Sequence, residues 1–145
     1  MTDHIDALLR DIFNRTRCVA VVGFSLNPAR PSHYVARYLQ DLGKRIVPIN
    51  PGHAGKSALG EVILPDLAAI PPEAGVDMID LFRRSEHVPP IVDQALTHLP
   101  DLRTIWMQLG VEHQGAAQSA RAAGVDVVMN RCPKIEYPRL FGAIS

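Results

Sequence analysis

The chain has 145 residues, 47% of them hydrophobic and 21% charged, which is the composition of a globular protein able to bury one sizeable core. Fifteen basic residues balance fifteen acidic ones, so an overall positive field that would attract nucleic acid or an anionic membrane surface is excluded. Residues 1–6 lack the pattern of a signal peptide and no apolar run approaches the ~20 residues of a membrane span, so we expect a cytoplasmic protein.

Helical and strand patterns alternate along the chain. Apolar residues recur at helical spacing over residues 4–15, which predicts a leading amphipathic helix. Short apolar runs predict five buried strands, although Asp77 and Asp80 are unusual within the third of them. In chain order we expect a strand at 17–22, a helix at 32–42 that ends at Gly43, a strand at 45–49, a loop at 51–56, a short turn at 65–70, a strand at 76–82, a helix at 88–99, a strand at 104–109, a helix at 113–123, a strand at 125–129 and a helix at 133–141.

These elements predict an α/β protein with a single domain over residues 1–145. Each crossover is long enough to hold a helix, so parallel pairing with right-handed connections is favoured. The common doubly wound solution is a five-stranded parallel sheet of order 3-2-1-4-5, numbered along the chain, with helices on both faces. The turns at Gly23, Asn50, Phe82 and Gln108 then lie along the carboxyl edge of the sheet, where such sheets bind ligands, and the switch point lies beside the first strand.

The turn after the first strand is the strongest candidate for an anion site. An apolar run leads into Gly23 and then into a helix start, whose N–H groups and dipole favour anions. Only one glycine of the dinucleotide fingerprint G-x-G-x-x-G is present, and the second strand ends in Asn50, with no acid to accept ribose hydroxyls. Ser25 and Ser32 can donate hydrogen bonds, and Arg30 can hold a phosphate through two of them. A plain turn with a serine cap is the alternative.

The third and fourth strands also end in residues that suit a nucleotide. Phe82 provides a flat apolar face and is followed by the guanidinium groups of Arg83 and Arg84, which suits a purine with a phosphate nearby. The alternative is that the arginine pair is a solvated approach to the next helix. Gln108 and Gly110 lie at the end of the fourth strand, where a side-chain amide and a bare backbone can approach a ligand.

Residues for catalysis are harder to identify than residues for binding. No Ser/His/Asp order, nucleophile elbow, H-x-x-E-H pattern or Walker loop occurs in the sequence. Cys18 and Cys132 lie outside any disulfide framework or zinc-ligand spacing, and we expect buried thiols. A reactive thiol at the carboxyl edge is the alternative for Cys132. We therefore expect no metal site, and the sequence does not require an enzyme.

Several motifs, specific in combination, run almost from end to end of the chain. They are Val21-Val22-Gly23-Phe24-Ser25 with Arg30-Pro31-Ser32, Val47-Pro48-Ile49-Asn50-Pro51, Leu59-Gly60-Glu61, the run from Phe82 to Pro89, Trp106-Met107-Gln108-Leu109-Gly110, and the run from Arg131 to Glu136. With these motifs the chain resembles the small bacterial CoA-binding proteins, single-domain relatives of the nucleotide-binding half of the succinyl-CoA ligase alpha subunit.

The resemblance implies a Rossmann-like sheet that holds coenzyme A, or an acyl-CoA, by its nucleotide end. For the pyrophosphate region it implies Gly23, Phe24, Ser25, Arg30 and Ser32, bordered by Asn50 and Pro51, with Lys56 as a nearby cation. For the adenine and the neighbouring edge it implies Phe82 and Arg83, then Gln108 and Gly110. The ligases also use a phosphorylated histidine from a second domain, so their reaction is not implied for this chain.

Three functions stay open at this point. The first is a protein that binds coenzyme A or an acyl-CoA without catalysis of its own. The second is an NADP-type oxidoreductase module in which Arg30 or Lys56 holds the 2′-phosphate. The third is a subunit of an acyl-CoA-using enzyme whose catalytic groups come from a partner protein. The sequence also leaves open whether the chain forms a homo-oligomer.

Overall fold

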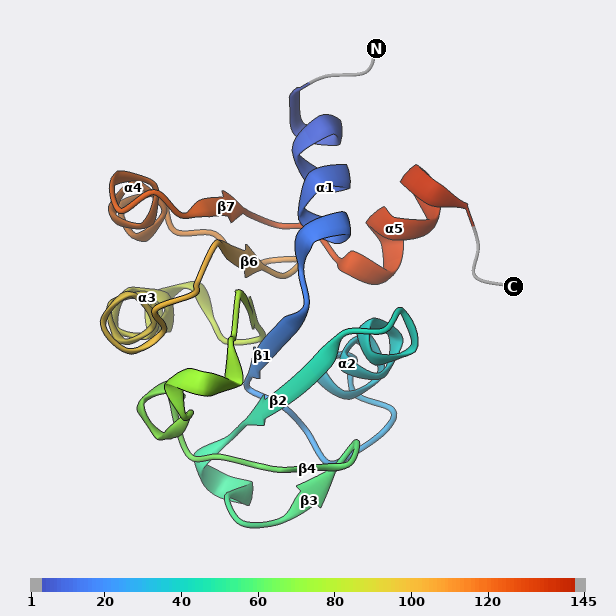
Figure 1. The fold of residues 1–145 in the computed structure, drawn as a ribbon, viewed down its shortest axis with the longest axis vertical. Coiled ribbons are helices and arrows are strands. Elements are labelled where there is room, and N and C mark those ends of the chain that lie inside the picture. Colours follow the sequence, from blue (N-terminus) through green and yellow to red (C-terminus); the bar gives the residue numbers. More distant parts are fainter. Residues whose placement is uncertain (1–3, 143–145) are drawn as a thin grey trace.

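The computed structural model describes residues 4–142 (Figure 1). The helices are α1 (His4–Arg15), α2 (Pro31–Asp41), α3 (Val88–His98), α4 (Gln114–Ala122) and α5 (Pro133–Phe141). The main strands are β1 (Cys18–Val22), β2 (Arg45–Ile49), β5 (Met78–Leu81), β6 (Thr104–Met107) and β7 (Asp126–Val128). The shorter elements are β3 (Ser57–Ala58), β4 (Glu61–Val62) and the 3-10 turns η1 (Pro51–His53), η2 (Leu67–Ala69), η3 (Pro72–Ala74) and η4 (Ser85–His87). The expected helices and main strands are confirmed, with ends that differ by at most two residues.

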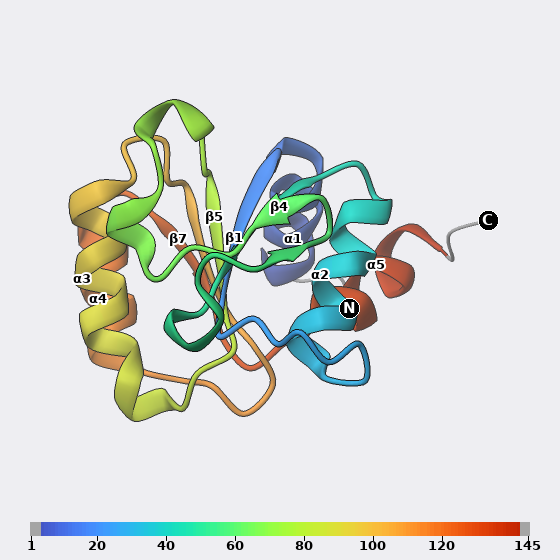
Figure 2. The same cartoon turned by 90° about the horizontal axis from the view of Figure 1, so that it is seen from below.

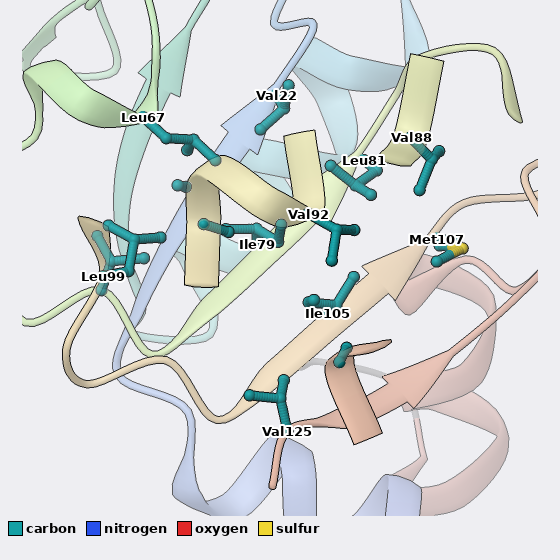
Figure 3. Packing of buried hydrophobic residues seen from close by; sticks show 14 of the residues in the cluster. Val22, Leu67, Ile79, Leu81, Val88, Val92, Leu99, Ile105, Met107 and Val125 are labelled. Carbon is teal, nitrogen blue, oxygen red and sulfur yellow. The ribbon is translucent and has the colours of Figure 1, made fainter. Parts of the chain in front are cut away.

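The α/β class and the helices on both faces of the sheet are also confirmed. α3 and α4 cover one face, and α1, α2 and α5 cover the other (Figure 2). On the α3 face, Ile79 and Leu81 of β5 pack in one cluster with Val92 (Figure 3). On the opposite face, the ring of Trp106 lies 5.5 Å from that of Phe13 in α1. None of these helices in the described part of the chain is long and apolar enough to cross a membrane.

The order of the strands differs from the expected one. The five strands are parallel and follow the order β2-β1-β5-β6-β7, which is 2-1-3-4-5 when the main strands are numbered along the chain. The expected order 3-2-1-4-5 is therefore wrong, because the third main strand pairs with β1 and not with β2. The switch point still lies beside β1, between β1 and β5.

The outer edge of β2 is occupied by the chain that follows it. Leu64 N donates to Pro48 O at 3.0 Å, and Asn50 N donates to Leu64 O at 2.9 Å. Pro48 has no N–H, and its nitrogen faces the same edge as its carbonyl oxygen, so a full strand ladder could not form there. Pro48 is thus the sequence signal that marks β2 as an edge strand.

A short hairpin, where no strand was expected, adds to this edge. β3 and β4 are antiparallel, with Ser57 opposite Val62. Leu59 and Gly60 form the turn, with φ values of +55° and +77°. A two-residue hairpin turn of this kind needs positive φ at both central positions, and Leu59 gives no signal for it because leucine rarely adopts that conformation.

The two aspartates of the predicted third strand lie in different surroundings. Asp77 lies just before β5, and its carboxylate accepts hydrogen bonds from Arg17 N at 3.0 Å and Cys18 N at 3.1 Å, which ties the starts of β1 and β5 together. Asp80 has no exposed surface and lies within β5. Cys18 and Cys132 are free and buried, as expected.

Candidate functional site

Three adjoining cavities lie at the carboxyl edge of the sheet, where β1, β5 and β6 end. The large cavity has a volume of about 610 Å³, the middle cavity about 380 Å³ and the small cavity about 190 Å³. Phe82 lines the large and middle cavities, Gly23 lines the middle and small ones, and Arg83 lines the large and small ones. The three cavities therefore meet at the switch point between β1 and β5.

The backbone at Gly23 brings the turns after β1 and β5 into close contact. Gly23 has a φ of +87°, and a Cβ placed there would lie 2.7 Å from Phe82 O and 3.2 Å from Arg83 Cδ. Gly23 N and Phe24 N both donate to Ile49 O, at 3.0 and 3.1 Å, so the turn is also tied to the end of β2. A side chain at position 23 would push these turns apart, which is why glycine is needed here.

The side chains of Phe24 and Asn50 hold the loop that follows Gly23, and neither residue lines any of the three cavities. Phe24 has no exposed surface, and its ring lies 5.0 Å from the ring of His33. Asn50 Nδ2 donates to Phe24 O at 2.7 Å, while Asn50 Oδ1 accepts from Gly52 N at 2.8 Å. The side chain of Phe24 thus lies in the core, and contact of this residue with a ligand stays a prediction.

The middle cavity gathers the residues expected around a phosphate. Gly23, Ser25, Arg30 and Ser32 line it together with Pro31 and Phe82. Ser25 N donates to Ser32 Oγ at 2.9 Å, which joins the loop to the first turn of α2. Arg30 is exposed and immediately precedes α2. Serine groups, an arginine and the positive end of the α2 dipole thus surround one cavity, and together they favour an anion.

Of the three residues expected beside the phosphates on the β2 side, Asn50, Pro51 and Lys56, the structure brings one to the cavities. Pro51 lines the small cavity. Lys56 is exposed and lies in the segment folded against the edge of β2, where Gly55 N donates to Ile63 O at 2.9 Å and Ile63 N donates to Lys56 O at 2.7 Å. Lys56 lines none of the three cavities.

The large cavity lies between the N-terminal turns of α2 and α5, over the ends of β5 and β6. It brings together the expected residues Phe82, Arg83, Gln108 and Gly110. Two further lining residues had been considered in the sequence, Arg84 as a cation near a purine and Cys132 as the alternative of a reactive thiol. The remaining residues that line the cavity are Pro31, Tyr34, Val35, Leu109, Val111, Lys134 and Ile135. Most residues that line the cavity are apolar, and three of them are cations, namely Arg83, Arg84 and Lys134, so the cavity suits an apolar group that is attached to an anionic one.

Hydrogen bonds fix the turn after β6 at the wall of this cavity. Gly110 has a φ of +80°, and its N–H donates to Asn130 Oδ1 at 2.7 Å. Ser85 Oγ lies 3.5 Å from Gly110 O and accepts from Glu112 N at 3.0 Å. The turn is thereby tied to the chain after β5 and after β7, which preorganises the cavity wall.

A buried carboxyl group, that of Asp80, lies beside Gln108, which lines the large cavity. Asp80 shares a face of β5 with Met78, whereas Ile79 and Leu81 face α3. One terminal atom of the Gln108 amide lies 2.9 Å from Asp80 Oδ1 and 3.2 Å from Oδ2. Burial raises the pKa of Asp80 well above its usual value. The signal in the sequence was an aspartate within an apolar strand, which gives no hint of its partner.

A parallel sheet between two helical layers, with its cavities at the switch point, defines the class of doubly wound ligand-binding domains. Comparison with known proteins names the family within this class. Residues 17–138 match the family described as CoA binding domain, and the chain belongs to that family.

Relatives of similar size support this assignment. The chain is 34% identical over 131 residues to the uncharacterized protein YneT of Bacillus subtilis, covering 90% of this chain and 93% of that one. A solved structure from Thermus thermophilus is 33% identical, with a TM-score of 0.85, and the match covers 94% of this chain and 98% of that one. A hypothetical protein from Pyrococcus horikoshii is 31% identical, with a TM-score of 0.85 and coverage of 94% and 92%.

Proposed function

We propose that this protein binds coenzyme A, or an acyl-CoA, through its nucleotide end at the carboxyl edge of the sheet, without catalysis of its own. The observation that carries the proposal is that an anion-binding cavity and a large apolar cavity meet at Phe82. Coenzyme A has a matching two-part chemistry, because a pyrophosphate joins its charged nucleotide to a mostly apolar arm. Membership of the CoA binding domain family supports this ligand class.

The pyrophosphate is assigned to the middle cavity. Ser25, Arg30 and Ser32 line this cavity, and Arg83 lies against Gly23 on the neighbouring turn. An arginine can donate two parallel hydrogen bonds to a phosphate, and such charge-assisted bonds are stronger than neutral ones. Lys56 is not needed in this arrangement, which removes one of the two cations that an NADP-type site would use.

The adenine is assigned to Phe82 and Arg83, and the arm to the large cavity. Large apolar side chains are rarely left exposed together unless they meet a ligand or a partner. Among the described residues, five large apolar side chains are exposed, and three of them, Tyr34, Leu109 and Ile135, line this cavity. An apolar arm that covers these side chains would remove them from water.

The polar groups near the cavities support binding without catalysis. Ser32 Oγ accepts a hydrogen bond from Ser25 N, and His33 Nδ1 lies 2.8 Å from Ser25 O. These hydroxyl and imidazole groups therefore serve the fold of the loop. A serine nucleophile would instead need a hydrogen bond to a base that can remove its proton.

Isothermal titration calorimetry tests the proposal with coenzyme A, 3′-dephospho-CoA and NADPH as ligands. We expect coenzyme A to bind most tightly, and Arg30→Ala to weaken its binding by about 10- to 150-fold, the range for a charged hydrogen-bonded contact. Arg37→Ala is the matched control, since Arg37 is an exposed arginine of α2, the helix that Arg30 precedes, and lines none of the three cavities. An absence of heat with coenzyme A, or tighter binding of NADPH, would contradict the proposal.

A further inference from the structure

The small cavity holds polar side chains that the assignment of the pyrophosphate and the arm leaves unused. Its volume of about 190 Å³ is below the ~300 Å³ at which pockets for drug-sized ligands begin, so it suits one ring system of a larger ligand. Buried apolar side chains of β1, β2 and η2 line it, namely Val22, Ile49 and Leu67. Its polar side chains are Asp66, Arg83 and Gln94.

A backbone hydrogen bond fixes the orientation of the Gln94 amide. Gln94 lies on α3, and its Oε1 accepts from Leu67 N at 3.2 Å. Only the oxygen of an amide can accept from an N–H, so the NH₂ is the end that stays free. Among the described residues, none accepts a hydrogen bond from this NH₂. Gln94 therefore offers the small cavity a donor.

Asp66 offers the complementary acceptor. It caps the turn η2, where its Oδ1 accepts from Ala69 N at 3.0 Å. No described residue donates to its other carboxylate oxygen, Oδ2. Asp66 immediately precedes Leu67, whose N–H binds Gln94, so the two polar side chains lie close together. The small cavity thus combines one free acceptor and one free donor with apolar walls.

We propose that Asp66 and Gln94 recognise the edge of the base and select a purine that carries an amino group at position 6. The inference rests on the proposed function, which places the adenine beside Arg83, because Arg83 also lines the small cavity. Adenine presents its N6 amine, a donor, next to N7, an acceptor. The amine would donate to Asp66 Oδ2, and N7 would accept from the Gln94 NH₂.

A 6-oxopurine does not fit the same two groups. It presents O6 and N7, which are both acceptors. O6 would face the Asp66 carboxylate with no hydrogen between the two oxygens, and an acceptor left unpaired in this way is costly. The pair therefore discriminates by rejecting the wrong base as well as by binding the right one.

The place of the small cavity also fits a base that is attached to bound phosphates. Gly23 lines both the middle and the small cavity, so a base in the small cavity lies next to the site assigned to the pyrophosphate. The apolar side chains can cover the faces of the ring, which leaves the edge of the base for the two polar groups.

The first test compares two nucleotides without the arm by isothermal titration calorimetry. Adenosine 3′,5′-bisphosphate and inosine 3′,5′-bisphosphate differ only in the group at position 6 and in the proton on N1. We expect the wild type to bind the adenosine compound about 5- to 150-fold more tightly, the range for a pair of hydrogen bonds to a base edge. Equal affinities would overturn the inference.

Variants of the two residues test their separate roles. Asp66→Asn keeps an oxygen for Ala69 N and replaces the free acceptor by a donor, so the preference for the adenosine compound should fall at least tenfold. Gln94→Glu keeps an oxygen for Leu67 N but loses the donor to N7, which both compounds carry. It should therefore weaken both to a similar extent.

The control for the lost charge is Asp93→Asn, since Asp93 is an exposed residue of α3 that lines none of the three cavities. The ratio of the two affinities cancels any general effect of charge on phosphate binding. An unchanged ratio in Asp66→Asn, or an equal change in Asp93→Asn, would overturn the inference, with folding of all variants checked by circular dichroism.

Titration with coenzyme A separates this inference from the proposed function. If coenzyme A gives no heat while the adenosine compound binds with the expected preference, the proposed function fails and recognition of the base stands. If coenzyme A binds and the two bisphosphates bind equally, recognition of the base fails and the proposed function stands. An absence of binding with coenzyme A and with both bisphosphates would overturn both.

Discussion

A single methyl group added at Gly23 tests the geometry at the centre of the site. The backbone there has a φ of +87°, and the Cβ of Gly23→Ala would lie 2.7 Å from Phe82 O. Carbon and oxygen atoms that are not bonded do not approach so closely, and the nearest atom belongs to the backbone. The variant must therefore displace the turn after β5, and with it the side chains of Phe82 and Arg83.

The expected cost follows from two separate contributions. A positive φ costs a residue other than glycine about 1–2 kcal/mol, and forcing extra atoms into a packed region costs about 1–3 kcal/mol more. Gly23→Ala should thus lower the free energy of unfolding by about 2–5 kcal/mol. Gly43→Ala is the matched control, because Gly43 has a φ of +94° and nothing lies within 4 Å of its Cβ position. Only the first contribution applies there.

Equilibrium unfolding in urea measures both variants, and calorimetry measures their affinity for coenzyme A. We expect Gly23→Ala to be the less stable of the two and to bind coenzyme A more weakly than Gly43→Ala does. Equal losses of stability would refute the reasoning, because the contact with Phe82 would then impose no constraint. A folded Gly23→Ala variant with unchanged affinity would show that the ligand does not depend on this turn.

Three further outcomes are expected. Asn50→Ala leaves Phe24 O without its hydrogen bond in a buried position, so the free energy of unfolding should fall by about 1–3 kcal/mol in urea. Burial raises the pKa of Asp80 in the folded protein above its unfolded value near 3.9, so wild-type stability should fall relative to Asp80→Asn by about 1.4 kcal/mol per pH unit between the two pKa values, with no further change above them. Burial also raises the pKa of Cys18 to about 11, so iodoacetamide should label this thiol only as fast as the protein opens, as followed by mass spectrometry.

Each of these expectations has a result that contradicts it. If Asn50→Ala is as stable as the wild type, a water molecule replaces the hydrogen bond that the Asn50 amide donates to Phe24 O. A stability difference between wild type and Asp80→Asn that does not change with pH would mean that Asp80 has the same pKa in the folded and unfolded chains. Labelling of Cys18 faster than amide exchange of β1 would mean that its thiol is accessible in the native fold.

Local sequence patterns were sufficient to predict the helices and main strands and to bring together part of the candidate site. The period of the apolar residues defines α1 and the main strands, because each pattern reports burial of one helix face or of a whole strand. Gly43 ends α2 as expected, with a φ of +94° and with Lys44 N donating to Leu39 O at 3.1 Å. The residues of the Gly23 turn come together in the middle cavity because they are close in sequence. Their role in binding stays a prediction.

The position of β5 and the content of the large cavity depended on contacts between distant segments. Pairing of β5 with β1 leaves no trace in the sequence of β5 itself, since β5 would bury the same apolar side chains beside β1 or beside β2. Pro48 was the one local hint to the strand order. It has no N–H to offer at the outer edge of β2, which indicates that no further strand pairs there.

Chain order therefore explains which turns lie at the carboxyl edge, whereas packing decides which side chains share a cavity. Tyr34 and Ile135 line the same cavity although about a hundred positions separate them, because α2 and α5 cover the same face of the sheet. Asp80 and Gln108 meet because β5 and β6 are adjacent in a register that only the assembled sheet defines. A hydrogen bond between side chains on different strands is set by the sheet, and no local pattern along the chain encodes it.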